Sequence, residues 1–174
     1  MIGLQRGTVQ VVAHHSDWCD LFEQERRLLR QQIGHLVLDI QHVGSTAVPG
    51  LDAKPILDIA VALASVAVIP QCIPRLYRIG YLDRGDGGAN GGYLLVKESA
   101  PEVRTHHVHM VTIDDSQWRH YLRFRDRLRA DEWLRAQYAT LKQDLQHQFS
   151  QDRQLYTAAK HDFIRGVLRQ QSHV

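Results

Sequence analysis

A dense run of glycine, hydroxyl, lysine and aspartate residues occupies positions 42–61, where the sequence reads HVGSTAVPGLDAKPILDIAV. Its first part, Gly44-Ser45-Thr46, ends one predicted strand, and a second strand that bears Asp58 follows a Pro-Gly turn. Glycine at a strand end lets a ligand approach the backbone, and the following N–H groups and two hydroxyls suit a phosphate. Lys54 would add a positive charge. We therefore interpret Gly44, Ser45, Thr46 and Lys54 as a candidate phosphate-binding set, although the phosphate-loop pattern of ATPases is not met.

Asp58 is a lone carboxylate in an apolar strand. Strand alternation places Asp58 and Ala60 on one face, and the larger apolar side chains of residues 57–63 on the other. A buried carboxylate without compensation is costly, so Asp58 requires a partner, a metal ion or contact with solvent. One interpretation is a catalytic, metal-binding carboxylate, and the other is a salt bridge, for example with Arg104. Its closeness in sequence to the phosphate-binding set favours the first interpretation.

Histidine is the unusual feature of the composition, with eleven in the chain and three between positions 106 and 109. On a strand, His107 and His109 share one face. If that strand neighbours the strand of Asp58, the three side chains converge beside the Gly-Ser turn. One carboxylate and two imidazoles suit Zn²⁺ or Mn²⁺ better than Mg²⁺, which prefers oxygen ligands. The alternative for the histidines is a polar strand face that binds no ion.

Another candidate lies near the C-terminal end, where Tyr156 and Lys160 stand four residues apart and so share a helical face. Lys160 could reach a phosphate, or it could pack its aliphatic stem on Tyr156. The pair also has the spacing of a dehydrogenase Tyr-x-x-x-Lys. No dinucleotide-binding glycine fingerprint follows an early strand, which disfavours hydride chemistry. No organic cofactor is predicted.

The elements that must position these residues form an α+β pattern. β-branched or continuously apolar segments predict strands at 8–13, 36–43 and 55–63. Two further strands, at 93–97 and 104–113, follow a glycine-rich connection at 85–92 and are expected to be antiparallel. Helical periodicity and capping residues predict helices at 16–33, 66–79, 116–129, 132–149 and 153–169. We predict one domain over residues 1–174, with a mixed sheet and flanking helices in 1–114 and a C-terminal helical region in 115–174.

Composition excludes several classes of protein. A chain of 174 residues with 44% hydrophobic and 23% charged residues is typical of a folded domain, and its net charge of +2 gives no strong nucleic-acid signal. Neither a membrane span nor the apolar core of a signal peptide is recognisable. Two cysteines make no disulfide framework, so we expect a reduced, cytoplasmic protein. The expected partner is a nucleotide or small phosphorylated ligand, and the pattern leaves the oligomeric state open.

The motif at residues 42–61 resembles the signature of the GrpB family. The resemblance continues, in the family's order and over most of the chain, in RTHHVH at 104–109, FRDRLR at 124–129, and YTAAK at 156–160 with Phe163-Ile164 after it. These blocks add Arg104 and Lys160 to the candidate phosphate-binding residues. The family is placed in the nucleotidyltransferase superfamily, whose hallmark is a Gly-Ser turn followed by a strand with acidic residues. The resemblance therefore implies a nucleotidyltransferase-like mixed sheet.

The resemblance also implies an activity, transfer of a nucleotidyl group from a nucleoside triphosphate with divalent metal ions such as Mg²⁺, Mn²⁺ or Zn²⁺. Asp58 would be the catalytic residue and, with His107 and His109, would bind the metal. The superfamily pattern has a second acid two residues after the first, a position that Ala60 occupies here, and the histidines stand where a third acid would fall. The alternative is a non-catalytic nucleotide- or phospholigand-binding module that kept the fold and lost the acidic triad.

Overall fold

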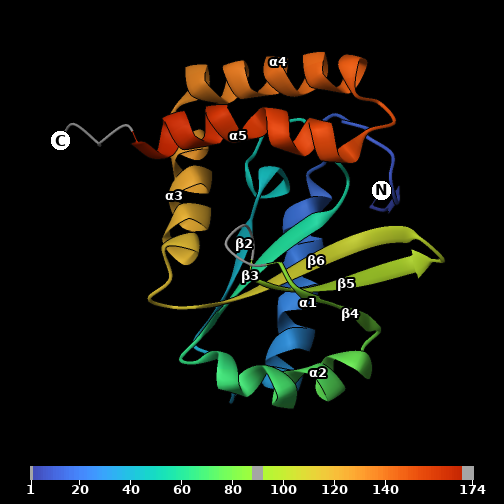
Figure 1. The fold of residues 1–174 in the computed structure, drawn as a ribbon, viewed down its shortest axis with the longest axis vertical. Coiled ribbons are helices and arrows are strands. Elements are labelled where there is room, and N and C mark those ends of the chain that lie inside the picture. Colours follow the sequence, from blue (N-terminus) through green and yellow to red (C-terminus); the bar gives the residue numbers. More distant parts are fainter. Residues whose placement is uncertain (1, 88–91, 170–174) are drawn as a thin grey trace.

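The computed structural model describes residues 2–87 and 92–169, and its described part is built around a mixed sheet of six strands (Figure 1). The strands are β1 Leu4–Gln5, β2 Asp39–Val43, β3 Leu57–Leu63, β4 Tyr81–Asp86, β5 Tyr93–Ala100 and β6 Val103–Thr112. Their order is β2-β3-β6-β5-β4, with β1 paired to the start of β6. The central strands β3 and β6 run parallel, and the other pairs are antiparallel.

Helices cover both faces of this sheet. They are α1 Asp17–Ile33, α2 Ile69–Tyr77, α3 Ser116–Ala130, α4 Glu132–Gln148 and α5 Arg153–Arg169, with single 3-10 turns η1 Ser45–Ala47 and η2 Val66–Val68. α1 and α2 share a core with one face, and α3 packs on the other. α4 and α5 lie side by side across one end of the molecule, next to α3 (Figure 1). The α+β prediction is confirmed.

The two faces of the central strand β3 pack against different helices. Leu57, Ile59 and the other odd-numbered side chains are buried in the core formed with α1. Ala60 and Ala62 face α3 and pack against Trp118. The predicted alternation is confirmed, and it places Asp58 on the α3 side of the sheet.

The strands differ from the prediction in two places, one predicted strand that does not form and one strand that was not predicted. Residues 8–13 form no strand beyond an isolated bridge between Val12 and Ala53. Their backbone is bound by the C-terminal helical region instead, since Val9 N–H donates to Ser150 C=O at 3.0 Å and Val11 N–H donates to Gln146 Oε1. Conversely, β4 was not predicted, because this edge strand is rich in charged residues and buries only alternate side chains.

The helix predicted at 66–79 divides into η2 and α2, with Pro70 near the start of α2 and Pro74 inside it. The glycine-rich connection joins the antiparallel strands β4 and β5, as expected of a hairpin, although residues 88–91 lie outside the described residues. No helix in the described part of the chain has the length and apolar character that crossing a membrane would require.

Candidate functional site

Asp58, His107 and His109 converge on the α3 side of the sheet. The parallel pairing of β3 and β6 sets Asp58 opposite His107 and Ala60 opposite His109. His107 Nδ1 lies 3.1 Å from Asp58 Oδ1, and His109 Nε2 lies 3.6 Å from the same oxygen. One ligand atom from each of the three side chains falls within 4.8 Å of the others. The predicted convergence is confirmed, and the separation is one that a single metal ion could bridge.

The carboxylate of Asp58 is held in its ionised form. Burial alone would raise its pKa, but the interactions with His107 and His109 outweigh this effect and hold the pKa of Asp58 well below its usual range. The side chain is 35% exposed, so it is not sealed inside the sheet. An ionised, accessible carboxylate beside two imidazoles is a suitable ligand set for a cation.

Position 44 must be glycine because the carboxylate of Asp58 packs directly against it. It has φ +69° and ψ −171°, a combination that is almost exclusive to glycine, and a Cβ there would lie 2.7 Å from Asp58 Oδ2. We interpreted Gly44 from the sequence as a point where a ligand approaches the backbone. In the structure the group that approaches is the Asp58 carboxylate, and Gly44 is not among the residues that line the adjoining cavity.

The turn η1 that follows Gly44 is fixed from two sides. The hydroxyl of Thr46 lies 3.0 Å from His42 Nε2 and 3.4 Å from the carbonyl oxygen of Ile56. From α3, Arg129 Nε donates to the carbonyl oxygen of Ala47 at 2.9 Å. Ser45 and Thr46 are thereby held at the wall of the cavity. His42 is part of this support, because it is buried and stacked on Phe22, and burial lowers its pKa to about 4.

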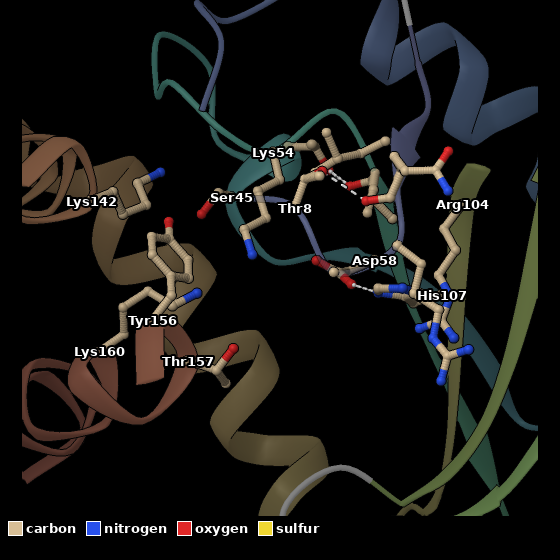
Figure 2. A pocket seen from close by; sticks show the side chains of 16 residues that line it. Thr8, Ser45, Lys54, Asp58, Arg104, His107, Lys142, Tyr156, Thr157 and Lys160 are labelled. Atoms are coloured by element: carbon tan, nitrogen blue, oxygen red, sulfur yellow. Dashed lines mark hydrogen bonds and ion pairs between the residues drawn. The ribbon is translucent and has the colours of Figure 1, made fainter. Parts of the chain in front are cut away.

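A cavity of about 190 Å³ adjoins Asp58 (Figure 2). Among the described residues that line it, five are lysine or arginine, and Asp58 is the one acid; the basic residues are Arg6, Lys54, Arg104, Lys142 and Lys160. Figure 2 shows Asp58 between His107 and Arg104 on one side and Tyr156, Lys142 and Lys160 on the other. This balance of charge favours a ligand with several negative charges.

Three lysines, Lys54, Lys142 and Lys160, gather at one end of the cavity, which we call the lysine end. Lys54 Nζ lies 4.2 Å from the ring centroid of Tyr156, and Lys160 Nζ lies 4.4 Å from it. Lys160 therefore packs on Tyr156, as one interpretation expected, and it also lines the cavity, where the other interpretation would have it reach a phosphate.

Lys142 was missed by the sequence analysis. The buried residues of α4 are Leu134, Tyr138, Lys142 and Leu145, so this lysine lies within the apolar stripe of its helix. That position was the available signal, because a lysine is almost never fully buried without a partner.

Arg104 and the histidine next to the cluster have partners elsewhere. Arg104 is 5% exposed, and its Nε lies 3.9 Å from Glu98 Oε1. His106 points to the opposite face of the sheet, where its Nε2 lies 3.8 Å from Glu25 Oε2 and burial lowers its pKa to about 4. Of the three neighbouring histidines, only His107 and His109 therefore lie beside Asp58, as strand alternation predicted.

Comparisons with known proteins place this chain in a family. The model of the GrpB protein family matches residues 8–170. The chain is 34% identical over 173 residues to the glutamate-rich protein GrpB of Alkalihalophilus pseudofirmus, covering 98% of this chain and 99% of that protein. It is 37% identical over 150 residues to a UPF0157 protein of Streptomyces coelicolor, covering 86% and 77%.

A solved structure of a protein with the same family name also matches this chain. The crystal structure of the conserved protein GrpB from Enterococcus faecalis matches with a TM-score of 0.82 and 33% sequence identity, covering 91% of this chain and 94% of that chain. The blocks that resembled the family in the sequence, from the Gly44 turn to Lys160, lie within the matched residues 8–170. The chain therefore belongs to the GrpB family.

Proposed function

We propose that this protein binds a nucleotide or another phosphorylated ligand together with a divalent metal ion, in a fold of the nucleotidyltransferase type. The observation that carries the proposal is the meeting, in one cavity, of Asp58 and His107 with the lysine end. The cluster supplies ligands for a cation, and the lysines supply charge for phosphate groups. A phosphorylated ligand with its metal ion needs both.

The metal ligands would be Asp58, His107 and His109. One oxygen and two nitrogens within 4.8 Å of one another fit Zn²⁺ or Mn²⁺, and three protein ligands leave a coordination position for the ligand. Bound there, the ion would polarise a phosphoryl oxygen. Mg²⁺ fits this donor set less well, because it prefers oxygen ligands.

The protein's own residues would orient the ligand. Lys54 and Lys160 would neutralise phosphate oxygens at the lysine end, and Ser45 and Thr46 line the same cavity. The turn-then-strand order, Gly44-Ser45 followed by Asp58, is the feature shared with nucleotidyltransferases. In the corresponding reaction an acceptor hydroxyl attacks the α-phosphorus of a nucleoside triphosphate, and pyrophosphate leaves with the electron pair of the broken bond.

A binding module without catalysis is the second candidate, and Ala60 favours it. Ala60 is fully buried against α3 and lies opposite His109, at the position where the superfamily has its second acid. β3 therefore offers one carboxylate toward the cavity instead of two. A two-metal mechanism normally needs more carboxylate ligands than this.

Thermal-shift measurements test the proposal and separate the two candidates. We expect ATP, GTP, CTP, UTP or CoA, added with Mg²⁺, Mn²⁺ or Zn²⁺, to raise the melting temperature by about 5–10 °C near saturation. Release of pyrophosphate from a stabilising nucleotide would identify a transferase, and stabilisation without release would identify a binding module. Absence of stabilisation by every nucleotide, with and without each metal, would contradict nucleotide binding and with it the transferase candidate.

A further inference from the structure

The lysine end contains a buried lysine side chain that has no ion-pair partner among the described residues. Lys142 is 2% exposed, its Nζ donates to the carbonyl oxygen of Asp52, and the same Nζ lies 4.8 Å from the ring centroid of Tyr138. Among the described residues, no carboxylate forms an ion pair with it. A buried lysine in this situation is costly while charged, and it lines a cavity that a ligand could enter.

The charged and titratable groups around Lys142 come from several elements. The pKa of Lys142 is lowered to about 7, chiefly by burial and also by the positive charge of Lys160 on α5, while Asp52 acts in the opposite direction. The Asp52 carboxylate is shared with other donors, because it accepts from Gln143 Nε2 at 3.3 Å. The remaining titratable or charged groups near Lys142 or lining the cavity are Arg6, Lys54, Asp58, Arg104, His107, Tyr138 and Tyr156.

We propose that the lysine end binds a phosphate dianion and that Lys142 takes up a proton when the dianion binds. This inference rests on the proposed function and adds the terminal group of the ligand and its dependence on pH. In the free protein above neutral pH, Lys142 is mainly an uncharged amine. A dianion beside Lys142 supplies the missing negative charge, so the amine takes a proton from the buffer and becomes an ammonium. No covalent bond forms or breaks.

The sign of the pH effect follows from this exchange. Above pH 7 each binding event consumes up to one proton, so the affinity falls as the pH rises. Between pH 7.5 and 8.5 the dissociation constant should increase about five- to tenfold. Below about pH 6 Lys142 is already charged and the phosphate itself begins to gain a proton, which ends the benefit of further acidification.

Calorimetric titration of the full chain with methyl phosphate, in EDTA, isolates this step from metal binding. Titrations at pH 7.5 and 8.5, each in two buffers of different ionisation enthalpy, count the protons taken up. We expect uptake approaching one proton for the wild type and none for Lys142→Met. Lys54→Met is the matched control, because it should weaken binding while keeping the uptake. An affinity independent of pH, or uptake that persists in Lys142→Met, would overturn the proposal.

The same experiment separates this inference from the proposed function. If nucleotides with metal stabilise the protein and methyl phosphate binds without uptake of a proton, this inference fails and the proposed function stands. If neither binds, both fail.

A second measurement needs no variant. The folded-state pKa of Lys142 is lowered, so the unfolded chain binds more protons between about pH 7 and 10, and the melting temperature of the wild type should rise from pH 7 to pH 9. A flat or falling profile would contradict a buried, uncompensated Lys142.

Discussion

Asp58 is accommodated by its surroundings in a way that leaves it available for binding. Oδ1 of its carboxylate lies 3.1 Å from His107 Nδ1 and 3.6 Å from His109 Nε2, and 35% of the side chain is exposed. The exposed part of the carboxylate leaves room for a further interaction beside the two histidines.

Replacement of Asp58 tests its role as the anionic ligand. We expect Asp58→Ala to abolish Zn²⁺ or Mn²⁺ binding, because the remaining imidazoles are neutral ligands without a charge opposite the ion. The fold should persist with a loss of at most about 1–2 kcal/mol, since the side chain contributes a few polar contacts at the cavity wall. Calorimetric metal titration and thermal melts measure the two effects. Retained metal affinity would place the ion, if one binds, elsewhere.

The histidines allow a comparison between neighbouring residues on one strand. His109→Ala should weaken metal binding by more than about tenfold and should affect nucleotide binding less, because His109 contacts Asp58 and is not among the residues that line the cavity. His106→Ala is the control, because His106 faces Glu25 on the opposite side of the sheet. Equal losses of metal affinity in both variants would indicate a general effect on β6.

At the scale of elements, the sequence predicted the faces of β3 and β6 but not their adjacency. Alternation is a local property, so it placed Asp58 and Ala60 on one face and His107 with His109 on one face. Residues 58 and 107 are 49 positions apart, and their contact depends on the parallel pairing of the two strands. Spacing alone cannot determine that pairing, and it entered the prediction through the family resemblance.

The errors in the elements have physical reasons as well. Residues 8–13 include β-branched side chains, yet the N–H groups of Val9 and Val11 donate to the C-terminal helical region, and Val9 is buried against Leu145 and Tyr156. Propensity could not reveal this, because the competing interactions come from residues about 140 positions away. Lys142 was missed for a different reason. Its place in the apolar stripe of α4 was visible, but nothing in the sequence relates that stripe to the motif around Asp58, which it meets only in the folded chain.

The turn between β2 and β3 gives a test at the scale of elements. Gly44 and Gly50 both have positive φ, +69° and +74°, but an added Cβ meets Asp58 at Gly44 and nothing within 4 Å at Gly50. We expect Gly44→Ala to destabilise the protein by about 1–3 kcal/mol and to weaken metal binding by displacing the carboxylate. Gly50→Ala should carry a backbone penalty of about 1–2 kcal/mol and keep its metal affinity. Urea denaturation and metal titration distinguish the two, and a Gly44→Ala protein with normal metal binding would show that the close approach is unimportant.

At the scale of the whole molecule, the cavity is completed by parts of the chain that are far apart in sequence. The sheet supplies Asp58 and His107, the η1 turn supplies hydroxyls, and the helices α4 and α5 supply Lys142 and Lys160. The residues before the matched family region, including Arg6, also line it. The sheet therefore carries Asp58, His107 and His109, whereas two of the three residues of the lysine end, Lys142 and Lys160, come from the helices.

This dependence leads to a prediction about residues 115–174. Hydrogen bonds between the helices and loops of the sheet-rich part join the two, among them those that Arg129 donates to the carbonyl of Ala47 and Lys142 to that of Asp52. Val48 and Leu51 are buried in one cluster with side chains of α3, α4 and α5. We therefore expect limited trypsin digestion to release no stable fragment beginning near Ser116, because separating it would expose these apolar side chains.

Mass spectrometry of the digest, with circular dichroism of any fragment that persists, gives the readout. Cleavage should lead to loss of the whole fold instead of a resistant C-terminal piece, and added nucleotide with metal should slow the first cut, since the ligand would bridge the sheet and the helices. A fragment from about residue 116 onward that stays helical and melts cooperatively would show that the helices form an independent bundle. In that case the lysine end would belong to a separate unit, and the cavity would be an interface between two domains.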